Sequence, residues 1–168
     1  MKKYHPPLKE MPEILLPDHP GSFGARRRYD VHTGVDLYCP HGTEVFAMED
    51  GVVVDIDWFT GPKAGFPWWN NTRAVMVAGD TGHIVYGEIQ EREGLNVGDK
   101  VKAGDFVGTV LTVLKEDKGK PMSMLHVELM KNTEHHHLVW HLDQPKHEAL
   151  LDPTPMLLSI KRNEDEEI

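Results

Sequence analysis

Two histidines and one aspartate have the residue types needed to hold a metal ion. His32 and Asp36 lie in the segment HTGVDL, and His126 lies far along the chain in SMLHVEL. Gly34 allows the chain to turn sharply, which would direct both nearby side chains toward one point. Two histidines and one carboxylate with an open fourth position form the coordination of a catalytic zinc ion. Taken singly, each histidine is more often an ordinary surface or core residue.

The segment around His126 has the alternation of a β-strand. Its residues fall into two sets: Leu125, Val127 and Leu129 on one face, and Met124, His126 and Glu128 on the other. The apolar set is expected to pack on the core. His126 would then lie on the polar face of a strand whose back is well packed.

The elements that must position these residues are predicted to be short strands. Residues 43–56 give two β-rich runs broken by Asp-Gly at 50–51, which predicts a hairpin. Residues 74–77 and 83–86 form a second pair around the turn GDTG. Long helical periodicity is absent from residues 31–128. The pattern predicts a mainly β fold in a single domain, as an antiparallel β-sandwich or a barrel-like sheet.

The rest of the chain divides by composition. Residues 1–20 are rich in proline and are interpreted as an extended N-terminal segment. The domain is expected to span residues 21–160 and to include a His-rich loop at 131–151. Residues 161–168 are charged and are expected to form a frayed tail.

The His-rich loop and a tryptophan pair each allow two interpretations. The loop could form a second metal site from these residues: His135, His136, His137, His141 and His147. Consecutive histidines cannot all face one point on a regular strand or helix, so a solvated loop is favoured. Trp68 and Trp69 either anchor their Pro/Gly-rich loop or form the aromatic wall of a substrate groove.

Charge and hydropathy exclude some classes of partner. The 168 residues include 18 Lys+Arg and 27 Asp+Glu, so the net charge is 18 − 27 = −9. Such a chain has no general attraction for nucleic acid or anionic membranes, and neither is expected as a partner. The arginines at 26–28 are interpreted as a solvated loop.

No apolar run approaches the roughly 20 residues of a membrane span. The N-terminus lacks the apolar stretch of a signal peptide, so the expected location is the cytoplasm.

Six segments in order resemble the lysostaphin-type zinc endopeptidases. They are SFGARR, HTGVDL, PHGTEVFAMEDGVV, GLNVGDKVKAGDFVGTV, MLHVEL and DPTPMLL, and they cover roughly residues 22–158. The resemblance implies a duplicated hybrid motif built around an antiparallel sheet. It implies that His32, Asp36 and His126 bind zinc (Zn2+). It also implies a peptide of bacterial peptidoglycan as substrate, often cleaved at a glycyl bond.

The chain departs from this family at two positions. Glu88 follows Tyr-Gly where the family usually has a histidine, and Met124 replaces the first histidine of the usual His-x-His-x-Glu. In the family these two histidines activate water and stabilise the tetrahedral intermediate. A thioether can neither accept a proton from water nor donate a hydrogen bond. Glu88 could serve as a general base, or it could bind zinc directly and close the fourth position.

Three functional hypotheses follow from these residues. The favoured one is a zinc-binding protein of lysostaphin-type fold whose peptidase chemistry is altered or lost. The alternative is an active zinc metalloendopeptidase with Glu88 as general base. A biotinyl or lipoyl carrier domain is disfavoured, because the turn AMEDG lacks the lysine that a carrier needs. The sequence leaves the oligomeric state open.

Overall fold

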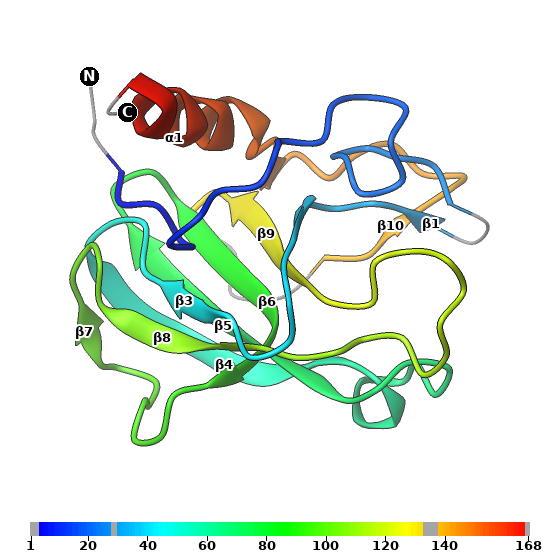
Figure 1. Cartoon of the computed structure of the whole chain (residues 1–168), viewed down its shortest axis with the longest axis horizontal. Helices are drawn as coiled ribbons and strands as arrows, with labels where there is room; N and C mark the ends of the chain where they lie inside the picture. The colour runs from blue at the N-terminus through cyan, green and yellow to red at the C-terminus, as the bar shows by residue number, and fades with distance from the viewer. Residues whose placement is uncertain (1–3, 28–29, 133–137, 167–168) are drawn as a thin grey trace.

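The computed structural model describes residues 4–27, 30–132 and 138–166 and shows a mainly antiparallel β domain (Figure 1). In chain order, the described elements are β1 (Asp30–Val31), β2 (Val35–Tyr38), β3 (Glu44–Phe46), β4 (Gly51–Thr60), the 3-10 helix η1 (Pro62–Ala64), β5 (Thr72–Gly79), β6 (His83–Glu91), β7 (Lys100–Val101), β8 (Phe106–Val110), β9 (Met124–Met130), β10 (Trp140–His141), β11 (Leu150–Leu151) and α1 (Thr154–Glu166). The prediction of a mainly β single domain is confirmed.

One sheet of nine strands carries most of the fold. Its central path runs β11-β9-β6-β5-β4-β7, while β2 pairs with β9 and β8 pairs with both β6 and β3. Strands β1 and β10 form a separate two-stranded sheet. The long strands β9, β6, β5 and β4 lie side by side across the middle of the molecule (Figure 1). Asp36 and His126 lie where β2 pairs with β9, and His32 lies in the segment between β1 and β2.

The predicted hairpin over residues 74–86 is confirmed. Strands β5 and β6 pair in antiparallel register, with Val77 opposite Ile84. The turn is closed by a 3.0 Å hydrogen bond from the Gly79 N–H to the Gly82 carbonyl. Gly82 has a φ of 148°, a conformation that side chains rarely adopt. The local turn signal therefore sufficed to predict this pairing.

The hairpin predicted around residues 50–51 is wrong. Strand β3 pairs with β8, whereas β4 pairs with β5 and β7. The link between them passes through the interior, since Ala47 and Met48 are fully buried. The Met48 N–H donates to the Tyr86 hydroxyl at 2.8 Å, and Asp50 accepts from the Ala103 N–H at 2.8 Å. Contacts with distant parts of the chain therefore outweigh the local turn propensity.

Both chain ends pack on one face of the sheet. Residues 4–20 contain no helix or strand, as expected, yet Leu8, Met11 and Ile14 are buried in the main core. The expectation of a frayed tail from residue 161 is wrong, because α1 continues to Glu166. This helix buries three apolar residues in the same core: Met156, Leu157 and Ile160. The Lys161 ammonium also donates to the Met11 carbonyl at 2.9 Å.

The opposite face of the sheet is covered by residues 138–151. A second core cluster joins Met76 and Val85 of the central hairpin to Leu150, and Leu138 and Trp140 pack against it. Part of the predicted His-rich loop is thus paired as β10 and β11. Of its histidines, His135, His136 and His137 lie outside the described residues. None of the helices in the described ranges has the length and apolar character needed to cross a membrane.

Leu8→Ala should destabilise the protein, although residue 8 precedes every strand. Leu8 is 1% exposed within the core, whereas Leu16 on the same segment is 55% exposed. Removing a buried leucine side chain typically costs about 2–5 kcal/mol of unfolding free energy. The matched change Leu16→Ala should cost less than about 0.5 kcal/mol. Urea denaturation measures both values. If both substitutions lowered the free energy of unfolding by the same small amount, the N-terminal segment would not belong to the folded core.

Candidate metal centre

The three predicted ligands converge in the fold. One ligand atom from each of His32, Asp36 and His126 lies within 4.8 Å of the others, and all three residues are buried. The His126 Nδ1 atom is 3.0 Å from Asp36 Oδ1 and 3.1 Å from His32 Nε2. Asp36 and His126 are direct cross-strand partners in the β2–β9 pair. Sequence positions 90 residues apart are thereby placed in contact.

The second nitrogen of each imidazole is already held by the protein. His32 Nδ1–H donates to the Ser22 carbonyl at 2.9 Å, and His126 Nε2–H donates to Glu128 Oε1 at 2.9 Å. A neutral imidazole has one donor and one acceptor nitrogen. The acceptors His32 Nε2 and His126 Nδ1 therefore face each other and the Asp36 carboxylate. Three electron-pair donors directed at one point fit a metal cation.

The charges around this point also favour a cation. Burial acts to raise the pKa of Asp36, but the neighbouring histidines outweigh it and hold the pKa well below its usual range. Burial acts to lower the pKa of His126, but hydrogen bonds to Asp36 and Glu128 raise it to about 10. Protons and a metal ion would compete for the same nitrogen atoms, so metal affinity should fall as the pH is lowered.

Glu128 hydrogen-bonds to His126, and the sequence analysis placed it on the correct face without giving it a role. Its side chain is fully buried and also accepts a hydrogen bond from the Thr33 hydroxyl. A carboxylate behind a ligating histidine sets its tautomer and raises its basicity. The sequence feature that could have indicated this contact is the position of Glu128, two residues beyond His126 on the same predicted strand. The apolar set Leu125, Val127 and Leu129 packs in the core as expected.

Gly34 acts differently from the prediction. Its φ does not lie in the left-handed region, so no sharp turn requires glycine there. Instead, a Cβ at this position would lie 2.3 Å from the Val127 carbonyl oxygen and 2.8 Å from His126 Nε2. Glycine is needed because β2 and β9 approach closely beneath the ligand ring. This tight approach fixes the position of His126 against Asp36.

Glu88 lies at an irregular position of β6. It has a φ of 65°, and the β5–β6 register skips it between Gly87 and Ile89, so it is the extra residue of a β-bulge. Its side chain lines the same pocket as His32 and His126. Glu88 Oε2 is buried and has no hydrogen-bond partner among the described residues. Burial, and then the charge of Asp36, raise the pKa of this carboxyl to about 8.

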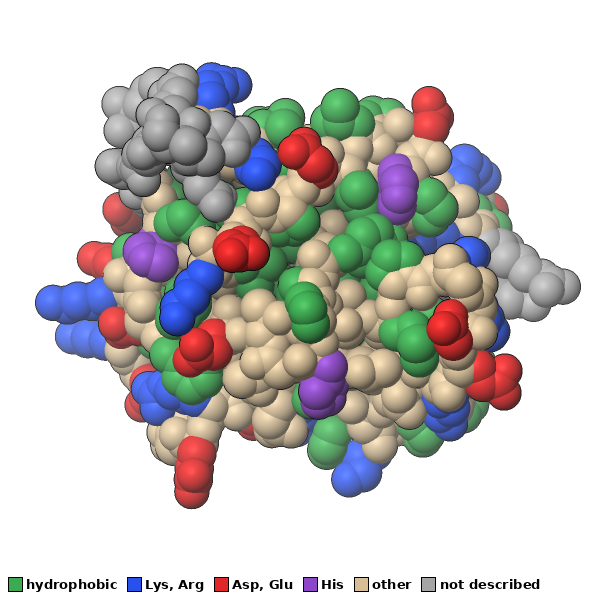
Figure 2. Space-filling view, in the orientation of Figure 1, with side chains coloured by type: hydrophobic (Ala, Val, Ile, Leu, Met, Phe, Trp, Pro, Cys, Tyr) green, Lys and Arg blue, Asp and Glu red, His purple; other side chains and the backbone are tan. Residues whose placement is uncertain are grey.

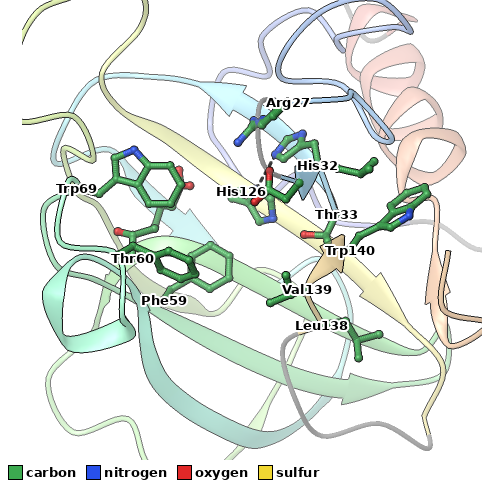
Figure 3. Close-up of a pocket in the computed structure, with 14 residues that line it drawn as sticks. Arg27, His32, Thr33, Phe59, Thr60, Trp69, His126, Leu138, Val139 and Trp140 are labelled. Atoms are coloured by element: carbon green, nitrogen blue, oxygen red, sulfur yellow. Dashed lines mark hydrogen bonds between the residues drawn. The ribbon is translucent and has the colours of Figure 1, made fainter. Parts of the chain in front are cut away.

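The pocket beside the ligands has aromatic walls. Phe59, Phe66, Trp69 and Trp140 line it together with Leu138 and Val139 (Figure 3). Phe59 stacks near His126, with ring centroids 5.1 Å apart. A Cβ on Gly87 would lie 2.8 Å from the Phe59 ring, so glycine leaves room for this contact. Of the tryptophan pair, Trp69 forms part of the wall and Trp68 is 59% exposed.

Two further residues adjoin the site. Met124 is buried in β9 and lies directly opposite Tyr38 of β2, two pairs along from Asp36 and His126. Arg27 lies with its Nη2 atom 3.6 Å from Asp36 Oδ2. The sequence analysis had assigned the arginine run to a solvated loop; the Arg27 side chain is 36% exposed, but it also lines the pocket. The sequence of a basic run does not indicate which of its side chains will line a pocket.

Solved structures of similar fold are found in bacterial proteins. Csd3 of Helicobacter pylori matches with a TM-score of 0.51 and 20% identity over 98% of this chain, which spans 41% of Csd3. The catalytic domain of the antimicrobial peptidase lysostaphin from Staphylococcus simulans matches at 0.56 and 22% identity, covering 82% of this chain and 89% of that domain. CbpA of L. salivarius REN matches at 0.60 and 19% identity, covering 96% and 98%. At these identities, the matches show a shared fold.

Sequence comparison points to the same group. No curated protein matches the chain. A family model described as Peptidase family M23 matches residues 30–138, which are more than half of the chain. The matched range contains His32, Asp36 and His126, the three residues that converge in the structure. The chain therefore belongs to peptidase family M23.

Proposed function

We propose that this protein binds one zinc ion through His32, Asp36 and His126, and that its peptidase chemistry is altered relative to the family. The convergence of two acceptor nitrogens and one carboxylate oxygen carries the zinc proposal. Zinc suits a compact set of nitrogen and oxygen ligands with few members, whereas Ca²⁺ and Mg²⁺ need more oxygens. A zinc ion bound there would polarise a carbonyl or lower the pKa of a bound water.

The altered chemistry follows from Met124. In the family the corresponding histidine supplies a hydrogen bond to the developing oxyanion. The Met124 thioether has no proton to donate, and its burial in β9 keeps it within the sheet beside Tyr38. The loss of one such donor typically lowers kcat by about 10²–10³-fold. A weak or silent hydrolase is the expected consequence.

A second function is supported by Glu88. A glutamate with positive φ is strained, at a typical cost of about 1–3 kcal/mol, and such positions cluster at functional sites. Its buried oxygen without a partner faces the pocket beside the ligands. A carboxylate there could accept a proton from water, as a general base does. On this alternative the protein is a zinc metalloendopeptidase. Its substrate would be a peptide of the peptidoglycan type, since one structural match is an antimicrobial peptidase.

Purified protein should contain about one equivalent of zinc per chain. His126→Ala should lose most of it, because two remaining ligands hold zinc poorly. His141 is exposed and lies outside the converging group, so His141→Ala should keep the full equivalent. Elemental analysis after gel filtration measures all three proteins. Wild-type protein that lacks zinc, even after incubation with zinc salts, would refute the proposal.

Glu128→Gln should weaken zinc binding by about 10–100-fold, because a neutral amide replaces the carboxylate that polarises His126. Glutamine keeps the size of the side chain and its hydrogen-bonding oxygen, so the fold should persist. Glu49 is another buried carboxylate, bonded to Thr81 away from the ligands, and Glu49→Gln should leave zinc affinity unchanged. Competition with a chromogenic chelator gives the affinities. Equal affinity in wild type and Glu128→Gln would mean that Glu128 does not tune the site.

Wild-type protein should hydrolyse pentaglycine and cell-wall peptides slowly or not at all. The double substitution Glu88→His with Met124→His restores both family histidines and should raise the rate by about 10²-fold or more. Each single substitution provides a control for the other, and zinc content must be equal in all samples. Turnover by wild type at about 1 per second or faster, abolished by Glu88→Gln, would instead establish Glu88 as the base.

Glu88→Gln also tests whether Glu88 closes the fourth coordination position. A fourth ligand contributes to affinity, so its loss should weaken zinc binding in the chelator competition. Unchanged affinity with lost turnover would assign Glu88 to the reaction. Weakened affinity without any turnover in wild type would assign it to the metal.

A further inference from the structure

Arg27 lies at the mouth of the metal pocket. Its Nη2 atom is 3.6 Å from Asp36 Oδ2 and donates to the Pro20 carbonyl at 3.0 Å. The side chain lines the pocket that His32 and His126 also line, and Figure 3 shows it beside His32. Arg27 is the single lysine or arginine among the described residues of that wall. A permanent positive charge thus adjoins the place where the three ligand atoms converge.

Local pairing explains why Arg27 faces the pocket while its neighbour does not. Arg26 and Val31 form an antiparallel bridge, and the Arg27 N–H donates to the Asp30 carbonyl at 2.8 Å. Adjacent residues of an extended segment point to opposite sides. Arg26 accordingly extends to the Leu142 carbonyl, 3.5 Å from its Nη2 atom. The run of arginines therefore contributes one side chain to the site and one to the surface.

We propose that Arg27 donates hydrogen bonds to a negatively charged oxygen of a ligand bound beside the zinc. The proposal rests on the zinc site proposed above and adds a ligand-binding residue to it. The guanidinium has five N–H donors. Among the described residues, its hydrogen bond goes to Pro20 through Nη2, so Nε and Nη1 remain able to donate.

The surroundings of Arg27 favour this role over a purely structural ion pair. The separation of 3.6 Å from Asp36 is that of a loose pair, whereas Arg73 and Glu91 elsewhere on the sheet pair at 2.8 Å. The aromatic side chains of Phe59 and Trp69 line the same pocket and offer apolar contacts to a ligand held by Arg27. The Met124 thioether cannot donate a hydrogen bond, whereas the Arg27 guanidinium can.

The charged oxygen can come from two sources. One is the free carboxylate of a bound peptide or N-acyl amino acid. The other is the oxyanion that would form if water attacked the carbonyl of a peptide bound in this pocket. Guanidinium donates two parallel N–H···O bonds to a carboxylate, and charge-assisted hydrogen bonds to a single oxyanion oxygen. The neighbouring apolar walls suit a ligand with an aromatic side chain next to this oxygen.

Binding titrations on zinc-loaded protein test the proposal. The ligands are N-acetylphenylalanine, its neutral amide, and a phosphonamidate phenylalanine peptide with an amidated C-terminus. Fluorescence of the wall tryptophans Trp69 and Trp140 reports binding.

The variants are Arg27→Gln, Arg27→Lys and the matched control Arg26→Gln. Arg27→Gln should bind the anionic ligands roughly tenfold more weakly or worse, with an unchanged affinity for the amide. Arg27→Lys should retain part of the affinity, and Arg26→Gln all of it.

The outcomes separate the two sources. A loss confined to N-acetylphenylalanine identifies a carboxylate ligand, a loss confined to the phosphonamidate identifies the oxyanion, and a loss for both shows that Arg27 binds either. Equal affinity in wild type and Arg27→Gln for both anions overturns the proposal. Wild-type protein that binds the neutral amide as tightly as the anionic ligands also overturns the proposal. If the protein takes up no zinc, the zinc proposal fails, and the same titrations on metal-free protein still decide whether Arg27 binds anions.

Discussion

The antiparallel pairing of β2 with β9 is the constraint on which the site depends. It places Asp36 directly opposite His126, and it brings the backbone at Gly34 so close to Val127 that no side chain would fit between them. Side chains alternate along a strand, so a slip of one residue would turn Asp36 to the other face. The apolar back of β9 opposes such a slip, because it would expose buried leucine and valine side chains.

The polar side chains of this buried site need hydrogen-bonding or ionic partners within the protein. His32, Asp36, His126 and Glu128 are all buried, and burial without partners would be costly for each. The structure meets this requirement with a chain of contacts from the Ser22 carbonyl through both imidazoles to Glu128 and Thr33. The Asp36 carboxylate and the two imidazoles form a buried group that could hold a metal ion.

Glu88 and Met124 lie outside the group of three converging side chains. The bulge holds Glu88 in a strained conformation at the pocket wall. Met124 keeps its place in β9 and preserves the packing of the strand. The three candidate ligands converge, and the proposed change in proton chemistry rests on Glu88 and Met124. Arg27, from a different segment, brings a donor that cannot lose its proton.

The sequence alone determined the features that depend on local periodicity and on residue chemistry. The alternation around His126, the β5–β6 hairpin and the β-rich character follow from neighbouring residues, and the motif resemblance selected the three ligands. The tertiary structure decided the pairing of β3 with β8, the burial of Leu8, the continuation of α1 and the inward direction of Arg27. Each of these depends on contacts between residues far apart in the chain. Local propensity carries no information about which distant segment will supply the partner.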